Sequence, residues 1–289
     1  MPKSLSIVGA GRVARALGRR LRELRWKIGA VVARTEPKAR KAVRFIGGGR
    51  AQAGVSPQCL QSETILIAVP DDAIASVADE LARIGGASLR GKSVLHTSGA
   101  LDASALSSLR ACGAFVGSLH PLQTFSGVGV PPLEGRVFGV EGDGAAVKTA
   151  RRIALAPSGI PVNISAEKKP LYHAAGAFAA GHLLALEEAG VQMLMSAGMK
   201  RREAVRALLS LSRQVLEHYE KLGPHQAWTG PLSRRDYGVV MDHEAAIGRA
   251  RPEFLEAYQV VNRLAAHVLS NDPGTLLREL EAISESKQV

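Results

Sequence analysis

A glycine-rich turn near the start of the chain limits the possible folds most strongly. The stretch LSIVGAGRVARALGRRL places Gly9, Gly11 and Ala14 in the spacing G-x-G-x-x-A, after a strand pattern and before a helical one. In such a turn the first glycine permits the bend, the second lets the backbone approach a diphosphate, and the third small residue packs the helix onto the sheet. The turn therefore predicts a dinucleotide site with Gly9, Gly11, Arg12 and Val13 in contact with the ligand. An ordinary glycine turn in an α/β domain without a ligand is the alternative.

The residue after the second strand pattern distinguishes between two cofactors. The stretch AVVARTEPKARK puts Arg34 where an acidic residue would bind the ribose 2′-hydroxyl of NAD. An arginine accommodates a 2′-phosphate instead, because its guanidinium can form two parallel hydrogen bonds with phosphate oxygens. We therefore predict NADP(H) as the cofactor, with Arg34 at the 2′-phosphate and with Arg12, Thr35, Lys38 and Arg40 able to add contacts. The alternative is that Arg34 is a solvated loop residue.

Strand and helix patterns alternate in the first half of the chain and give way to helical patterns in the second. Alternation predicts a mostly parallel sheet with helices on both faces. The fold class is therefore predicted as α/β then all-α, a Rossmann-type sheet domain at 1–165 followed by a helical domain at 166–289. The expected strands are 5–10, 28–33, 64–69, 93–98, 114–120, 136–142 and 160–165, and the expected helices include 71–84, 144–156, 168–198, 201–222, 237–249, 252–270 and 273–284.

Composition favours a globular cytoplasmic enzyme. The chain is 46% hydrophobic, which suffices for a packed core. No apolar run reaches the roughly 18 residues of a membrane span, no secretory leader pattern precedes the first strand, and two cysteines make no disulfide framework. The net charge of +11 could indicate nucleic-acid binding. Aromatic residues are only 4%, however, and the basic residues scatter over helix faces, so a pocket for an anionic ligand is the simpler interpretation.

Polar residues follow two of the expected strands at the edge where parallel strands end. Ligands of open α/β sheets bind at that edge. We therefore expect Val69 and Pro70 to flank the cofactor and Asp71 to cap the following helix. The polar stretch 96–98, and Ser98 in particular, is expected near the nicotinamide end.

Three further stretches carry a family resemblance. They are GSLHPLQTF at 117–125, which contains His120, KPLYHAAGAFAAGHLLAL at 169–186, and AWTGPLSRRD at 227–236. With the glycine turn they resemble a bacterial family of oxidoreductases that has a Rossmann-like domain and a helical C-terminal domain of uncharacterised function. The resemblance covers nearly the whole chain. It implies kinship with ketopantoate reductase, pyrroline-5-carboxylate reductase and the β-hydroxyacid dehydrogenases, and a helical domain similar to that of 6-phosphogluconate dehydrogenase.

The resemblance also implies roles for particular residues. A lysine at the start of the first long helix acts as general acid in that wider group, which indicates Lys169, with the adjacent Lys168 as the alternative. An asparagine that holds the substrate is replaced by Gly181 in this chain, followed by His182. Arg234 is retained and would bind a substrate carboxylate. The loss of the asparagine leaves two alternatives: His182 replaces its amide, or the site has lost one substrate contact.

The predicted function is an NADPH-dependent reductase of a small, anionic 2-oxo acid or imine, with ketopantoate as the best single substrate. Lys169 would donate the proton and Arg234 would bind the carboxylate, while Ser98 and His120 would line the site. The rival hypothesis is an NADP-binding sensor without turnover. A homodimer through the helical domain is expected. No metal is expected, because the histidines lack ligand spacing such as H-E-x-x-H.

Overall fold

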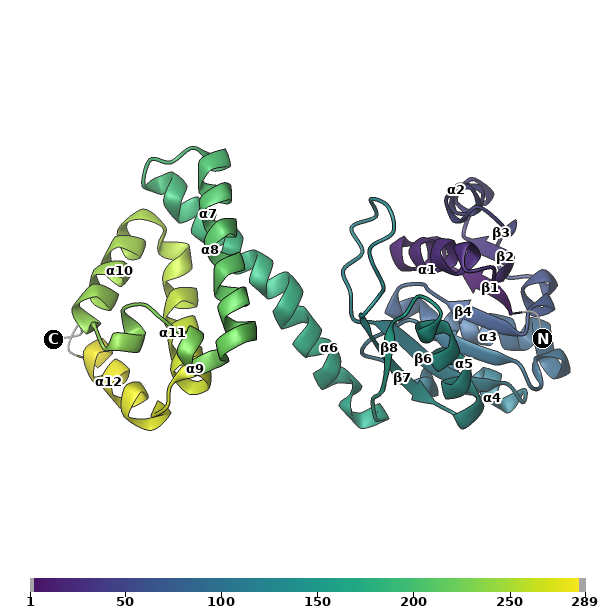
Figure 1. Cartoon of the computed structure of the whole chain (residues 1–289). Coiled ribbons are helices and arrows are strands. Elements are labelled where there is room, and N and C mark those ends of the chain that lie inside the picture. The colour runs from purple at the N-terminus through teal and green to yellow at the C-terminus, as the bar shows by residue number, and fades with distance from the viewer. Residues whose placement is uncertain (1–2, 286–289) are drawn as a thin grey trace. The chain divides into compact units, whose positions relative to one another are not determined.

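The chain divides into two units. The computed structural model describes residues 3–285, with the first unit at Met1–Ala180 and the second at Gly181–Val289 (Figure 1). The division falls inside the long helical stretch, later than the expected boundary at 165. The reason is that Lys169 and Tyr172, in the first turn of that stretch, form hydrogen bonds with strands of the sheet. Those bonds tie the start of the helix to the first unit.

The first unit contains one sheet of eight strands in the order β3-β2-β1-β4-β5-β6-β7-β8. Strands β1 to β6 are parallel, β7 runs antiparallel to β6, and β8 is parallel to β7. The predicted mostly parallel Rossmann-type sheet is thereby confirmed. The strands are β1 (Ser4–Val8), β2 (Lys27–Ala33), β3 (Arg50–Ala53), β4 (Thr64–Ile67), β5 (Ser93–His96), β6 (Phe115–Pro121), β7 (Val137–Gly142) and β8 (Ile160–Asn163).

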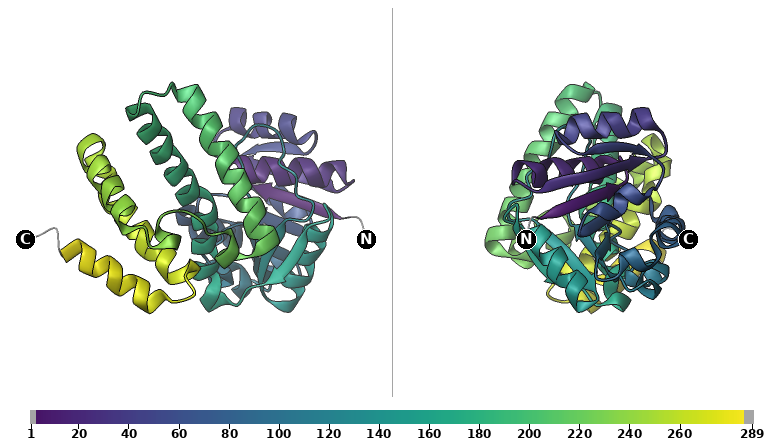
Figure 2. Two further views of the ribbon diagram at one scale, coloured as in Figure 1. Left: turned by 60° about the vertical axis from the view of Figure 1, so that its left-hand side comes forward. Right: turned by 90° about the vertical axis from the view of Figure 1, so that its right-hand side faces the viewer.

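Helices cover both faces of the sheet (Figures 1 and 2). They are α1 (Arg12–Glu23), α2 (Glu36–Ile46), α3 (Ile74–Gly85), α4 (Ser107–Ala111) and α5 (Gly144–Leu155). Because side chains alternate along a strand, β1 contributes to two cores. Leu5 and Ile7 pack with α1, α2 and α5 on one face, whereas Val8 packs with α3 and α4 on the other.

Two local features differ from the sequence patterns. Strand β3 has the sequence Arg-Ala-Gln-Ala, forms no apolar run and lies at the sheet edge, so its pattern resembles a loop. The expectation that Asp71 caps a helix is wrong, because Pro70 and Ala73 occupy the cap positions of the turn Asp71–Ala73 and of α3. The Asp71 carboxylate instead accepts a hydrogen bond from Ser98 Oγ at 2.7 Å.

The second unit is helical throughout its regular elements. Helix α6 (Lys169–Ala177) begins in the first unit, and a π-helical turn (Phe178–His182) leads from it into α7 (Leu183–Ser196). The remaining helices are α8 (Arg201–Leu222), α9 (Pro224–Ala227), α10 (Tyr237–Ala250), α11 (Leu255–Leu269) and α12 (Pro273–Glu285). Helices α7 and α8 lie side by side (Figure 2). A small core of Leu232, Val240, Ala266 and Leu276 holds the later helices together.

Within residues 3–285 no helix has both the length and the apolar character that crossing a bilayer requires.

Candidate active site

A row of polar side chains crosses three neighbouring strands of the sheet. His96 on β5 pairs with Ser118 on β6, and Ser118 pairs with Glu141 on β7. The same row in β2, β1 and β4 holds only Val and Ile. Residues in register across a sheet point to the same face. Because β7 pairs antiparallel with β6, the carboxylate of Glu141 lies beside the buried hydroxyl of Ser118.

Lys169 places its ammonium against this row. Its side chain is 1% exposed, whereas the neighbouring Lys168 is exposed. The Lys169 Nζ atom donates to Ser118 Oγ at 2.8 Å and to the carbonyl oxygen of Ser98 at 3.2 Å. Burial lowers the pKa of Lys169, and the negative charge of Glu141 is the largest opposing influence. A buried lysine with a lowered pKa releases its proton more readily than a solvated one.

Glu141 completes a chain of hydrogen bonds that begins at Lys169. Ser118 Oγ donates to Glu141 Oε2 at 3.0 Å. The backbone N–H of Ala103 donates to both carboxylate oxygens of Glu141, which fixes the carboxylate in place. Ser118 is fully buried, and Glu141 is partly exposed. These hydrogen bonds thus lead from the interior of the unit to its surface.

Ser98 accepts the hydrogen bond from Lys169 with its backbone carbonyl oxygen and not with its hydroxyl. The hydroxyl donates to Asp71 and accepts from the backbone N–H groups of Ala100 and Leu101. These bonds fix the turn after β5 and orient the Ser98 carbonyl that receives the Lys169 ammonium. The predicted side-chain role of Ser98 at the substrate stays a prediction.

His96 is a neutral, fully buried histidine. Its Nδ1 atom accepts from the Ser98 N–H at 3.2 Å, so the proton resides on Nε2, which donates to the carbonyl oxygen of Asp102 at 3.0 Å. Burial lowers the pKa of His96 from 6.5 to about 4. Both ring nitrogens are therefore engaged in holding the loop 98–102, and neither is left for a ligand.

His120 lies beside the lysine in a cluster of rings. Its Nδ1 atom is 3.1 Å from the Tyr172 hydroxyl, and its ring meets those of Tyr172 and His173 edge to face. Burial, together with the charges of His173 and Lys169, lowers the pKa of His120 from 6.5 to about 4. A Cβ atom on Gly99 would come within 2.9 Å of His120 Nε2, so only glycine fits beside this ring. The structure therefore brings His120, Ser98 and Lys169 together.

The glycine turn between β1 and α1 has the properties that a diphosphate requires. Gly9 has φ of 130°, and a Cβ atom there would lie 2.1 Å from the carbonyl oxygen of Ala68, the residue that follows β4. Gly11 is exposed, and a Cβ atom there would meet nothing within 4 Å. No side chain caps the N-terminus of α1, and its first turn has no acidic residue. The free N–H groups of this turn fit an anionic group, so the turn can hold a dinucleotide.

The other predicted cofactor residues surround the same edge of the sheet. Arg34 is exposed at the end of β2, and no ion pair of its side chain is seen among residues 3–285. Thr35 is the N-cap residue of α2, and its hydroxyl makes no capping hydrogen bond. Val69 and Pro70 follow β4 directly. Arg12 and Val13 begin α1, and Arg12 Nη1 contacts the carbonyl oxygen of Phe125 at 3.5 Å.

Two predicted features belong to the helical stretch and the second unit. Arg234 forms an ion pair with Asp236 at 3.0 Å, and its role as a carboxylate ligand stays a prediction. Gly181 lies in the π-helical turn, and a Cβ atom there would meet nothing within 4 Å. Turns of this kind within α-helices are frequent at functional sites. The departure from asparagine therefore falls in an irregular turn with open space for a larger side chain.

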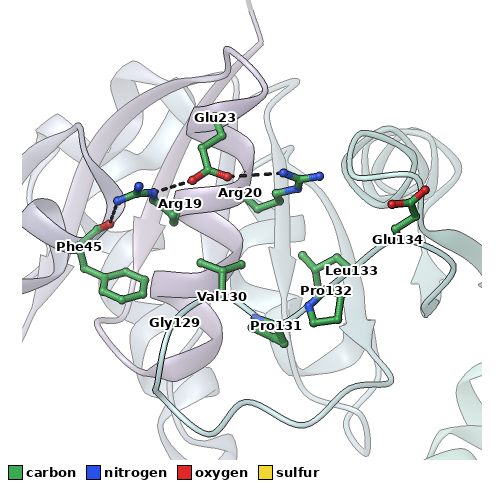
Figure 3. A pocket seen from close by; sticks show the side chains of 10 residues that line it. All are labelled: Arg19, Arg20, Glu23, Phe45, Gly129, Val130, Pro131, Pro132, Leu133 and Glu134. Atoms are coloured by element: carbon green, nitrogen blue, oxygen red, sulfur yellow. Dashed lines mark hydrogen bonds and ion pairs between the residues drawn. The ribbon is translucent and has the colours of Figure 1, made fainter.

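A cavity of about 550 Å³ lies beside α1 and is separate from these residues (Figure 3). Its lining combines the second half of α1 with the segment 129–134 of the loop between β6 and β7. Arg19 and Arg20 both form ion pairs with Glu23 in this lining. These residues lie two helical turns and more beyond the glycine turn. The cavity is therefore not the dinucleotide site. Within the described residues no cluster of three or more His, Cys, Asp or Glu side chains could hold a metal ion.

Sequence reasoning missed Ser118 and Glu141. Ser118 lies inside an apolar strand pattern, where a serine is more often a structural residue. Glu141 lies in a separate strand, and its proximity depends on the antiparallel register of β6 and β7. The stretch GSLHPLQTF, which drew attention to His120, contains Ser118 two residues earlier. Alternation along the strand places both on the same face, which was the available signal.

Two family models match this chain. A Rossmann-like domain matches residues 2–121, and a domain of unknown function, DUF2520, matches residues 136–265. The two matches follow one another along the chain and together span most of it. This finding confirms the resemblance that the sequence motifs indicated. The DUF2520 match begins at β7, so Glu141 and Lys169 lie in the DUF2520 domain while Ser98 and Ser118 lie in the Rossmann-like domain.

Solved structures share this fold over nearly the whole chain. Protein TM1727 from Thermotoga maritima is 26% identical with a TM-score of 0.70, covering 91% of this chain and 97% of that one. A candidate NADP oxidoreductase from Bacteroides fragilis is 20% identical with a TM-score of 0.74 and the same coverage of both chains. A pyrroline-5-carboxylate reductase from Coxiella burnetii is 15% identical with a TM-score of 0.62, covering 94% and 100%. None of the curated protein sequences matches this chain.

Proposed function

We propose that this DUF2520 protein is an NADPH-dependent reductase of a small carbonyl or imine compound. The observation that carries the proposal is the buried ammonium of Lys169, held by the Ser98 carbonyl and the Ser118 hydroxyl. It lies at the carboxyl ends of the parallel strands, the edge at which the glycine turn also opens. A proton donor and a dinucleotide turn at one sheet edge are the two requirements of a nicotinamide-dependent reduction.

The cofactor assignment rests on the turn and on Arg34. Gly9 and Gly11 would let the backbone approach the diphosphate, and the uncapped N-terminus of α1 would donate its N–H groups to it. Arg34 would bind the 2′-phosphate that distinguishes NADPH from NADH. NADPH would supply the hydride.

The protein residues would supply the proton and exclude water. Lys169 carries three N–H groups, and two of them have partners in the structure, which leaves one for the oxygen or nitrogen atom of the substrate. Transfer of that proton from Nζ would neutralise the negative charge that develops as the hydride arrives. His120, neutral because burial lowers its pKa to about 4, would offer a polar edge without competing for the proton.

The substrate class is proposed from the resemblance and from the fold. A pyrroline-5-carboxylate reductase shares the fold, which favours imines beside 2-oxo acids. Ketopantoate is the first 2-oxo acid that should be tested as a substrate. We also propose that the protein works as a homodimer through its helical unit and needs neither nucleic acid nor a membrane. The rival, an NADP-binding sensor, is favoured by one observation, the glycine at position 181 where the family resemblance implies a substrate-binding asparagine.

Fluorescence titration with NADPH and NADH, followed by addition of ketopantoate, 1-pyrroline-5-carboxylate and a panel of small oxo acids, tests the proposal. We expect tighter binding of NADPH than of NADH and oxidation of NADPH that depends on one of the added compounds. Tight binding of NADPH without oxidation by any compound in the panel would favour the sensor. Binding of neither nucleotide would refute the cofactor assignment.

A further inference from the structure

The burial of Lys169 raises a question about how the residue recovers its proton. A general acid that gives a proton to its substrate must be protonated again before the next turnover. The Lys169 side chain is 1% exposed, so its Nζ atom has almost no direct access to bulk water. Proton transfer from bulk water to this buried Nζ atom therefore requires intervening groups that can both donate and accept a hydrogen bond.

Of the two partners of Lys169 Nζ, only one meets that requirement. The Ser98 carbonyl oxygen accepts hydrogen bonds but has no proton to give. The Ser118 hydroxyl can do both, and it is 2.8 Å from Nζ. Its own hydrogen bond runs to Glu141 Oε2 at 3.0 Å, and Glu141 is partly exposed. Lys169, Ser118 and Glu141 thus form one continuous hydrogen-bonded path from the buried ammonium to the surface.

We propose that Ser118 and Glu141 relay protons from solvent to Lys169. After Lys169 has lost a proton, it is a neutral amine. A proton from water binds the Glu141 carboxylate, the carboxyl O–H passes its proton to Ser118 Oγ, and the serine O–H passes its own proton to Lys169 Nζ. The serine ends with one proton, the carboxylate returns to its anionic form, and the net change is one solvent proton gained by Lys169.

Two structural features suit this path to its task. The Ala103 N–H fixes the Glu141 carboxylate in the position where Oε2 meets Ser118. The charge of Glu141 also opposes the effect of burial on the pKa of Lys169, which favours return of the proton. The inference rests on the proposed function only in that the substrate is the group that takes the proton from Lys169. Exchange of the Lys169 protons with water takes place in the free protein as well.

The first test therefore uses no substrate. In protein labelled with ¹⁵N-lysine, NMR measures the exchange of the Lys169 ammonium protons with water, and Lys169→Met identifies the signal by its loss. Ser118→Ala and Glu141→Gln are each expected to slow this exchange by about tenfold or more. Ser118→Thr keeps the hydroxyl and is expected to restore it. Ser93→Ala is the matched control, because Ser93 is a buried serine on β5 whose hydroxyl forms a hydrogen bond with Thr149, away from Lys169.

An exchange rate in folded Ser118→Ala or Glu141→Gln equal to or above that of the unaltered protein would overturn the relay. If Ser118→Ala does not fold, Glu141→Gln and Ser118→Thr decide by the same criterion. Stopped-flow kinetics supplies a second test once a substrate is known. The first turnover of Ser118→Ala uses the proton already on Lys169 and should keep its rate, whereas later turnovers should slow by about tenfold. A first turnover slowed as much as the later ones would mean that Ser118 only positions Lys169. Failure to find a substrate would leave the NMR result standing.

Discussion

Lys169 is the residue whose replacement most directly tests the proposed reduction. Lys169→Met keeps the length of the side chain and removes the buried charge. Turnover is expected to fall by about 10² to 10⁴, the usual contribution of a general acid. Stability is expected to fall by about 1–3 kcal/mol, because the buried Ser98 carbonyl oxygen loses its donor and the Glu141 carboxylate loses the neighbouring positive charge. Steady-state kinetics and thermal unfolding measure these two quantities, and NADPH titration is expected to show nearly unchanged cofactor affinity.

The adjacent lysine provides the control for that experiment. Lys168 is exposed, so Lys168→Met should leave turnover and NADPH affinity near those of the unaltered protein. A Lys169→Met variant with full activity, or a Lys168→Met variant with the larger loss, would remove Lys169 from the proposed mechanism.

Arg34 decides the preference between the two nicotinamide cofactors. Arg34→Ala removes a guanidinium that would bind the 2′-phosphate, and hydrogen bonds to charged groups contribute about 1.5–3 kcal/mol. The affinity for NADPH should therefore fall by about 10- to 100-fold, with little change for NADH. Arg44→Ala, at the other end of α2, is the control. Equal losses for both nucleotides in Arg34→Ala would exclude a 2′-phosphate contact.

The buried histidines make the protein sensitive to acid. Burial lowers the pKa of His96 from 6.5 to about 4, so between these two values the unfolded chain binds more protons than the folded one. Stability is thus expected to decline as the pH falls from about 6.5 towards 4, with His96 contributing a slope of up to about 1.4 kcal/mol per pH unit. His96→Gln does not titrate and should show a smaller decline, even though it is less stable at every pH. Urea unfolding at pH 7 and pH 5 measures the difference, and equal declines in both proteins would contradict the assignment.

At the scale of elements, the turn between β1 and α1 contains two glycines with different expected roles. Gly9 is required by the fold, and Gly11 is expected to be required for binding the diphosphate. Gly9→Ala is strained by its φ of 130° and places a Cβ atom 2.1 Å from the Ala68 carbonyl oxygen, so it should destabilise the protein by about 1–3 kcal/mol or more. Gly11→Ala meets nothing within 4 Å and should change stability by only about 0.5 kcal/mol. Its methyl group would nevertheless obstruct the diphosphate and weaken NADPH binding. Chemical unfolding and NADPH titration of both variants distinguish the roles, and unchanged NADPH affinity in Gly11→Ala would argue against a diphosphate at this turn.

The sequence could predict those parts of the site that lie within a single element, but not those that depend on how elements pair. The glycine turn and the strands with apolar runs follow from local patterns, because spacing and alternation are properties of a single segment. Lys169 came from a resemblance and not from such a pattern. The pairing of Ser118 with Glu141 depends on the antiparallel register of β6 and β7, and no local pattern records which strand will lie opposite. Asp71 was misjudged for the same reason, since its partner Ser98 lies on another segment 27 residues away.

At the scale of the whole molecule, a stripe on α8 favours association with a second copy. Leu211, Val215, Tyr219 and Leu222 are 46–57% exposed, and their spacing of three and four residues places them on one face of the helix. A helix face of this kind, exposed in a protein of 30.5 kDa, is typical of an interaction surface. The stripe supports the proposed homodimer through the helical unit.

Replacement of one stripe residue by a charge tests this proposal. Leu211→Glu would bring a carboxylate into an apolar interface, and an unpaired buried charge is strongly unfavourable. Sedimentation equilibrium is expected to give twice the mass of 30.5 kDa for the unaltered protein and the single mass for Leu211→Glu. Arg213→Glu changes a charge on α8 two residues away, on another face of the helix, and should leave the dimer intact. A monomeric unaltered protein, or equal dissociation of the two variants, would show that the stripe does not mediate dimerisation.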